Sequence, residues 1–177
     1  MRRSRAFFGM GLALGALLAA VQVQALSVGV SRVENFAVLG DRARSGHMPI
    51  LLVVSQEDCP YCELLKREIL EPMLVSGEYD GRVIIRELLI DSELPVRDFD
   101  GRAIAPDELA RRYGARLTPT VLFLDDRGRE LTKPMIGINT VEFYGYYLDA
   151  AIDTARQHLP ARHPPGIRHL AIGDTPQ

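Results

Sequence analysis

The apolar residues of the chain fall into short runs separated by polar and turn-forming residues, and these runs predict its strands. Residues 50–54 form a continuous apolar run, the pattern of a strand buried on both faces of a sheet. Residues 83–90 are rich in branched side chains and predict the next strand. Residues 121–124 form a third run. The turn residues 125–128 follow it, with a further strand expected around residues 130–135, and together they predict a β-hairpin.

Other segments carry apolar residues at intervals of three and four, which predicts amphipathic helices. These are residues 28–45, the segment after Cys59, a short helix opened by Pro106 and closed by Gly114, and residues 141–156. Pro72 falls inside the second helix and should kink or end it. We interpret the aromatic residues at 143–147 as core and flank of the last helix. The order strand, helix, strand, helix, strand, strand, helix predicts an α/β domain whose mixed sheet has helices on both faces.

The two ends of the chain differ in composition from the middle. Residues 1–25 combine a head of three arginines, a glycine-interrupted apolar run and small residues at its end, which predicts a cleavable signal peptide rather than a membrane anchor. Residues 158–177 are rich in proline, histidine and arginine without periodicity, so we expect a mobile tail. The domain is then expected at residues 26–157. Residues 92–105 form an insertion in it, either a lid near the site or, as we favour, a surface excursion.

Signal cleavage would leave an acidic protein. The full chain has 21 Lys and Arg residues against 23 Asp and Glu residues, and losing three arginines leaves 18 against 23, a formal charge of −5. This balance argues against nucleic acid or anionic lipid as a partner. Export predicts a periplasmic protein with no membrane insertion after cleavage. There, two thiols tend to oxidise unless something reduces them.

The candidate chemistry lies in a Cys-Pro-Tyr-Cys motif at the start of the predicted second helix. Cys59 and Cys62 are the only cysteines of the chain, and Pro60 suits a first helical turn. The unpaired amides of a helix N-terminus favour the thiolate of Cys59 over its thiol. A second sulfur three residues on can attack a mixed disulfide and release a partner. We therefore interpret Cys59 as the nucleophile and Cys62 as the resolving cysteine.

Three other uses of the cysteine pair remain open from the residues alone. A structural disulfide is disfavoured because a three-residue step constrains little chain. Half of a zinc site is disfavoured because no second cysteine pair exists. A soft-metal carrier could draw on His47, but no thioether-rich run accompanies the pair. Redox exchange is the favoured interpretation, and it requires no organic cofactor and no metal.

A second motif, combined with the first, resembles a known fold. After the cysteine pair come Tyr113-Gly114 and then Thr118-Pro119-Thr120 ahead of the predicted hairpin, with Gly137 beyond it. Over residues 28–157 this resembles the thioredoxin fold, a three-layer α/β/α arrangement around a mixed sheet. The predicted signal peptide and the insertion make the chain most similar to periplasmic thioredoxin-like proteins, including the SoxW-type branch.

The resemblance implies roles for individual residues. Cys59 matches the exposed nucleophile and Cys62 the buried resolving thiol. Pro119 matches the cis-proline that faces the disulfide, and the backbone of Thr118 would pair with an extended substrate segment. Pro60 and Tyr61, between the cysteines, are then expected at the substrate-binding surface.

The chain also departs from the family pattern. Asp58 stands where thioredoxins usually carry tryptophan, and Val53 stands where a buried aspartate is expected. We place Leu88 at the position of the usual lysine on the next strand. These departures leave the proton acceptor for Cys62 unassigned, with Glu57 near it only in sequence.

The direction of electron flow follows from charge near the cysteines. Glu57, Asp58 and Glu63 should make the thiolate more costly, and a less stabilised dithiol makes a weaker oxidant. We therefore favour a protein-disulfide reductase that acts on exported proteins and is kept reduced by a membrane thiol–disulfide carrier. The alternatives are a periplasmic disulfide oxidase or isomerase, and a redox-inert peptide-binding or chaperone module of the same fold.

Overall fold

A computed structural model describes residues 29–161 of the chain. The predicted signal peptide at residues 1–25 and residues 162–177 of the predicted tail lie outside the described residues. Within the described part, none of the helices has the length and apolar character that crossing a membrane would require.

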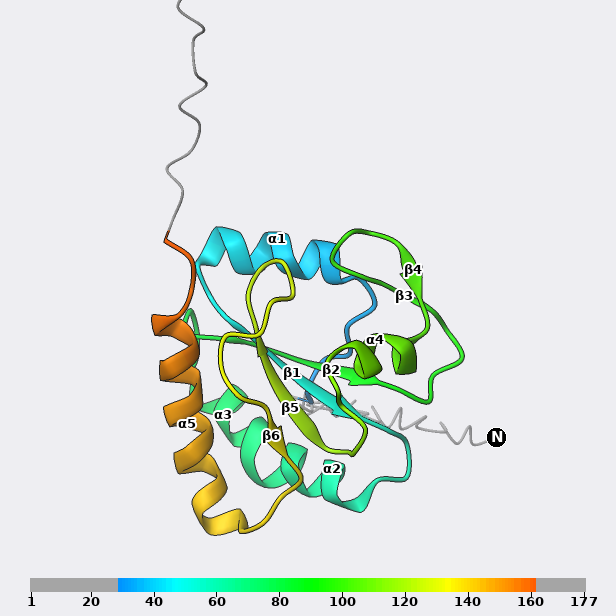
Figure 1. The fold of residues 1–177 in the computed structure, drawn as a ribbon. Helices are drawn as coiled ribbons and strands as arrows, with labels where there is room; N and C mark the ends of the chain where they lie inside the picture. The colour runs from blue at the N-terminus through cyan, green and yellow to red at the C-terminus, as the bar shows by residue number, and fades with distance from the viewer. Residues whose placement is uncertain (1–28, 162–177) are drawn as a thin grey trace, which may run out of the picture.

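A four-stranded mixed sheet in the order β2-β1-β5-β6 forms the centre of the domain (Figure 1). The central strand β1 (Ile50–Ser55) is fully buried and runs parallel to β2 (Ile84–Leu89). On its other side β1 pairs antiparallel with β5 (Thr120–Leu124), which pairs antiparallel with β6 (Met135–Ile136). The three predicted core strands are confirmed. The second strand of the hairpin is shorter than expected, because only a single bridge at Glu130 and the two residues of β6 pair with β5.

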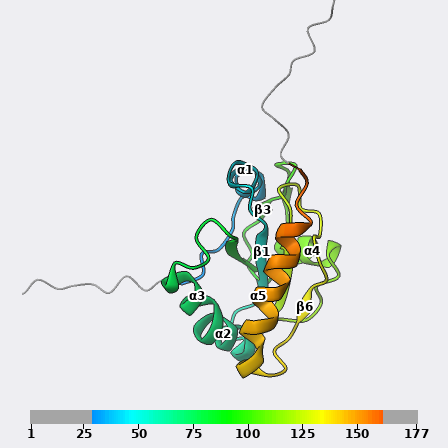
Figure 2. The same cartoon turned by 90° about the vertical axis from the view of Figure 1, so that its left-hand side faces the viewer.

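Helices cover both faces of this sheet, as the order of elements predicts. One hydrophobic core joins the sheet to α1 (Phe36–Gly46) and α4 (Pro106–Arg112). A second core joins the opposite face to α2 (Pro60–Leu65), α3 (Glu71–Ser76) and α5 (Val141–Gln157). Figure 2 shows α2 and α3 on one side of β1 and α4 on the other. The predicted arrangement, a mixed sheet between two helical layers, is confirmed.

The first predicted helix, at residues 28–45, is wrong in its beginning. Helix α1 starts only at Phe36, where Asn35 accepts a hydrogen bond from the Val38 N–H at 3.2 Å and caps the helix. The residues before it are extended and lie beside β2, since the Val33 N–H donates to the Glu87 carbonyl at 2.9 Å. The apolar spacing that suggested a longer helix comes from two side chains buried against the sheet, Val30 and Val33.

The cysteine-bearing helix passes Pro72 without ending. Between α2 and α3 the backbone widens into a π-helical turn, η1 (Lys66–Leu70), in which the Glu71 N–H donates to the Lys66 carbonyl. Pro72 then occupies the first turn of α3, where its missing N–H is tolerated. Pro72 is predicted to kink or end the helix, and it does not end it: the hydrogen-bonding pattern changes in the turn before Pro72, and the helical path continues to Ser76.

The insertion at residues 92–105 forms its own two-stranded sheet from β3 (Val96–Arg97) and β4 (Ala103–Ile104). The buried carboxylate of Asp98 accepts hydrogen bonds from two backbone N–H groups of the turn between the strands. The ring of Phe99 in that turn packs against Phe36 of α1, with the centroids 5.2 Å apart. The insertion is thereby attached to α1, at the upper right of the domain in Figure 1 and away from α2.

The aromatic cluster at residues 143–147 lies mostly at the surface. Only Tyr144 is buried, with 5% of its surface exposed, and burial raises the pKa of its hydroxyl. Phe143, Tyr146 and Tyr147 are all at least 60% exposed. The interpretation of the cluster as core and flank therefore holds for Tyr144 as core and for the other three as exposed flank.

Replacing either of two helical glycines by alanine should change the free energy of unfolding, in opposite directions at the two positions. A Cβ on Gly40 in α1 would overlap the backbone carbonyl of Asp126, whereas a Cβ on Gly145 in α5 would meet nothing within 4 Å. We expect Gly40→Ala to lower the free energy of unfolding by about 1–3 kcal/mol through overpacking. Gly145→Ala should raise it by about 0.5–1 kcal/mol through helix propensity. Urea unfolding followed by circular dichroism measures both, and a stabilising Gly40→Ala would contradict the close approach of α1 to the β5–β6 turn.

Candidate functional site

The two cysteines form a disulfide at the start of α2. Their sulfurs are 2.08 Å apart and their Cα atoms 5.2 Å apart. Cys59 is the N-cap residue and Pro60 the first residue of the helix. Cys62 is completely buried, whereas 7% of the surface of Cys59 remains exposed. Of the two sulfurs, Cys59 is thus the one nearer to solvent.

The turn into α2 directs a backbone donor at the outer sulfur. Asp58 adopts a left-handed conformation with φ of 52°, which ends the extended chain after β1. The Cys62 N–H then donates to Cys59 Sγ at 3.2 Å. A donor aimed at this sulfur stabilises a thiolate once the disulfide is reduced.

The loop that carries Thr118 and Pro119 lies next to the cysteine pair. Thr118 Oγ1 lies 3.6 Å from Cys59 Sγ, although 59 residues separate the two in sequence. The Thr118–Pro119 peptide bond is cis, and Pro119 is buried. The Thr118 hydroxyl also donates to Gln56 Oε1 at 3.1 Å. Gln56 was not singled out from the sequence, because an exposed glutamine after a strand carries no signal of its own.

Exposed side chains border the cysteine pair. Pro60 and Tyr61 are solvent-exposed between the cysteines, and 62% of the Tyr61 surface is accessible. Leu117, directly before Thr118, is 66% exposed. A segment approaching Cys59 would therefore meet apolar as well as polar surface.

The negative charge of the three acidic residues near the cysteines is partly compensated by neighbouring cations. Glu57 lies 3.9 Å from the guanidinium of Arg32, and Glu63 forms an ion pair with Lys66 at 2.6 Å. Asp58 is the remaining exposed carboxylate. The negative charge expected to disfavour the thiolate is thus smaller than the residue types alone suggest.

The register of the sheet corrects the placement of Leu88. Val53 on β1 is opposite Glu87 on β2, and Leu88 belongs to the core on the other face. Glu87 is only 3% exposed. Its carboxylate accepts hydrogen bonds from Ser55 Oγ at 2.5 Å and Lys66 Nζ at 3.0 Å. The sequence reasoning missed this buried acid, although the two charged residues inside the otherwise apolar segment 83–90, Arg86 and Glu87, are a signal that could have indicated it.

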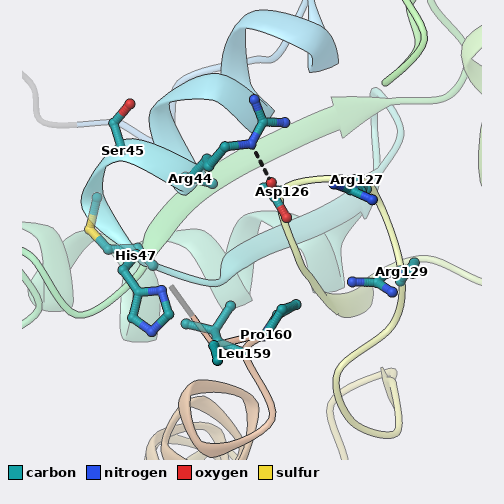
Figure 3. A pocket seen from close by; sticks show the side chains of 11 residues that line it. Arg44, Ser45, His47, Asp126, Arg127, Arg129, Leu159 and Pro160 are labelled. Carbon is teal, nitrogen blue, oxygen red and sulfur yellow. Dashed lines mark hydrogen bonds and ion pairs between the residues drawn. The ribbon is translucent and has the colours of Figure 1, made fainter. Parts of the chain in front are cut away.

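A separate cavity of about 680 Å³ lies at the other end of the sheet, between the end of α1, the β5–β6 turn and the end of α5 (Figure 3). Arg44, His47, Arg127 and Leu159 are among the residues that line it. Arg44 Nε donates to Asp126 at 2.6 Å, and this hydrogen bond raises the pKa of the guanidinium. None of the residues predicted to act in redox exchange lines this cavity.

The position of His47 corrects one alternative for the cysteine pair. His47 precedes β1 and the cysteines follow it, so the six residues of β1, about 20 Å of strand, separate them. His47 therefore cannot complete a metal site with Cys59 and Cys62. Elsewhere in residues 29–161, no three side chains of His, Cys, Asp or Glu gather closely enough to hold a metal ion.

Comparisons with known proteins identify a family and similar folds. The family described as thioredoxin-like domain matches residues 40–152. A structure of a DsbH oxidoreductase is similar, with a TM-score of 0.54 and 17% identity over 82% of this chain and 95% of that chain. Spinach chloroplast thioredoxin f has a TM-score of 0.48 and 20% identity over 75% of this chain and 98% of its own. Mitochondrial thioredoxin 3 of Saccharomyces cerevisiae has a TM-score of 0.48 and 14% identity over 70% and 93% of the two chains.

No curated protein sequence matches the chain. The family match and the fold shared with the DsbH oxidoreductase confirm the expected thioredoxin fold. Together with the disulfide between Cys59 and Cys62, they support thiol–disulfide oxidoreductase activity in general.

Proposed function

We propose that this chain, which belongs to the thioredoxin-like domain family, is a periplasmic reductase of disulfides in exported proteins, related to the SoxW-type branch. The observation that supports this most directly is the disulfide at the start of α2, whose outer sulfur, Cys59, lies against Thr118. A cysteine pair of this kind, with one sulfur partly accessible and next to a backbone donor, suits exchange better than structural cross-linking.

In the proposed reaction the reduced protein carries a Cys59 thiolate and a Cys62 thiol. The thiolate attacks one sulfur of a substrate disulfide, forms a mixed disulfide and releases the other substrate sulfur as a thiolate, which takes a proton from water. Cys62 then loses its proton and attacks Cys59 Sγ. The second substrate sulfur leaves as a thiol, so the substrate gains two electrons and the Cys59–Cys62 pair loses two.

The substrate segment would bind beside the sulfurs in an extended form. We assign Thr118 and Pro119 to the strand-like edge that receives its backbone, by strand addition. The exposed Pro60 and Tyr61 would contact its side chains on the helix side. The proposed reductase direction is supported by the acidic residues near the sulfurs. Within residues 29–161, Asp58 forms no ion pair comparable to those of Glu57 and Glu63.

A reductase must be re-reduced after each turnover. The predicted signal peptide supports a location outside the cytosol, where the electrons would come from a membrane thiol–disulfide carrier. Such a carrier presents its own cysteine pair, which would attack the Cys59–Cys62 disulfide in the reverse of the reaction above.

Insulin provides a defined test of this proposal. We expect the reduced wild-type protein to cleave insulin disulfides catalytically with an added dithiol. The Cys62→Ser variant should accumulate a mixed disulfide on Cys59, detectable by mass spectrometry, because nothing resolves it. The variant lacking both sulfurs is the matched control and should form no adduct. No adduct with Cys62→Ser, combined with no insulin cleavage by the wild-type protein, would overturn the proposal.

The reduction potential decides the direction. Equilibration of the Cys59–Cys62 couple in glutathione buffers should give a potential below that of glutathione for a reductase. A potential well above it would instead identify a disulfide oxidase.

A further inference from the structure

A second cavity, of about 290 Å³, lies between α1, the strand β2 and the extended segment before α1. Each of these three elements contributes one arginine to its lining, which are Arg32 from the segment, Arg42 from α1 and Arg86 from β2. Among the described residues that line it, Glu34 is the one acid, and it forms no ion pair with any of the three arginines. None of the residues assigned to disulfide exchange lines this cavity.

The register of β2 places Arg86 on the side of the sheet that α1 covers. Arg86 is opposite Leu52 on β1. Its neighbours two residues away, Ile84 and Leu88, belong to the core that packs against α1. Because side chains alternate between the two faces along a strand, Arg86 lies on the same face as these two residues. Its side chain is partly buried, and Nη1 donates to the carbonyl of Ile85 at 2.6 Å, which holds the guanidinium beside the core.

Helix α1 forms the opposite wall of the cavity. Val38, Leu39 and Arg42 line it, and their spacing of three and four residues places Arg42 on the same side of the helix as the two apolar residues. Burial lowers the pKa of the Arg86 guanidinium, and the positive charge of Arg42 lowers it further. The fold therefore holds two guanidinium groups close enough to repel each other, beside an apolar surface that Val33 completes.

The positive charge around this cavity is only partly compensated. Arg32 has two acidic neighbours, since its guanidinium lies 3.6 Å from the Glu87 carboxylate and 3.9 Å from that of Glu57. In the part of the chain that the structure describes, neither Arg42 nor Arg86 forms an ion pair with a carboxylate. Each guanidinium carries five N–H donors in a planar fork. Most donors of these two arginines therefore have no anionic partner among the described residues.

We propose that this cavity binds a small oxyanion, which is a phosphate, sulfate or carboxylate group held between Arg42 and Arg86. A guanidinium fork matches the paired oxygens of these groups and forms charge-assisted hydrogen bonds with them. A negative charge between the two arginines would also offset their mutual repulsion. The cavity is slightly smaller than the roughly 300–1,000 Å³ of typical ligand pockets, so it suits a compact ligand.

Nuclear magnetic resonance titrations of the ¹⁵N-labelled protein with inorganic phosphate and with acetate test the site, at constant ionic strength so that general screening is equal. We expect saturable shifts of backbone amides around Arg42 and Arg86 in the wild-type protein. Arg86→Met should weaken this binding about tenfold or more, because charge-assisted hydrogen bonds to the anion are lost. Tighter binding of phosphate would support a tetrahedral oxyanion as the ligand, and tighter binding of acetate a carboxylate. Shifts that do not saturate, or that occur away from the cavity, would overturn the proposal.

Two further variants make the test specific. Arg42→Met removes the exposed member of the pair, so it keeps the proposal testable should Arg86→Met fail to fold, and the same loss of affinity is expected. Arg156→Met is the matched control, because Arg156 is an exposed arginine on α5 outside the cavity. Its affinity should stay within about twofold of the wild-type value, since a lone exposed charge contributes little. An equal loss in Arg156→Met would show general charge attraction and overturn the site. The proposal does not depend on disulfide exchange, which insulin cleavage tests separately.

Discussion

Replacement of Cys59 by serine should abolish disulfide reduction, with the rate of insulin cleavage falling roughly 10³-fold or more, to the rate of the added dithiol alone. A serine hydroxyl ionises far less readily than a thiol and forms no disulfide, so neither the first attack nor the final closure of the pair can occur. The remaining sulfur, Cys62, is completely buried and cannot replace the lost nucleophile.

The comparison of the two single cysteine variants makes this prediction specific. A chromogenic aryl disulfide, mixed in equal amount with the reduced protein, should release one aryl thiolate on attack by Cys59 and a second on attack by Cys62. With it, Cys59→Ser should lose both phases, whereas Cys62→Ser should keep the first phase and lose the second. Circular dichroism of both variants against the reduced wild-type protein checks that the fold is retained. A first phase that survives in Cys59→Ser but not in Cys62→Ser would reverse the roles of the two sulfurs.

The cysteine pair and its opposing loop could be predicted because their information is local. Cys59 and Cys62 are separated by three residues, and a strand before them and a helix after them suffice to place both sulfurs at a helix start. Thr118 and Pro119 form a second local motif. Their meeting with Cys59 is a property of the whole sheet, in which β5 pairs with β1, and it entered the sequence reasoning only through the resemblance.

Glu87 could not be placed from the sequence because its position depends on strand register. A shift by one residue moves every side chain to the other face of the sheet, so the choice between Leu88 and Glu87 decides whether a carboxylate lies on the face covered by α2 and α5. The apolar pattern of residues 83–90 does not decide it, since both faces of β2 are buried. The pairing of β1 with β2, which sets Val53 opposite Glu87, is a contact between segments about thirty residues apart.

The error in the predicted start of the first helix has a related cause. An extended segment that packs one side against a sheet and a helix that does the same can bury similarly spaced residues. Val30 and Val33 are buried by the extended segment, and Phe36 and Leu39 are buried by helix α1. The capping hydrogen bond of Asn35 distinguishes the two, and asparagine is a signal that favours a helix start at this point.

Phe36→Ala should lower the free energy of unfolding by about 3–5 kcal/mol, a large share of the roughly 5–15 kcal/mol typical of a domain. Phe36 is completely buried at the first position of α1, and its ring packs on Phe99 of the insertion. Truncation would leave a cavity between α1 and the insertion as well as losing transfer free energy. Phe143 near the start of α5 is the matched control because it is 61% exposed.

Urea unfolding of both phenylalanine variants, with the disulfide kept intact, measures the difference. Phe143→Ala should change the free energy of unfolding by no more than about 0.5 kcal/mol. The loss in Phe36→Ala should also be partly shared with Phe99→Ala, so that the double variant loses less than the sum of the two single losses. Full additivity would mean that the two rings do not depend on each other, and the insertion would then be attached to α1 mainly by its backbone bridge at Asn35 and Arg97.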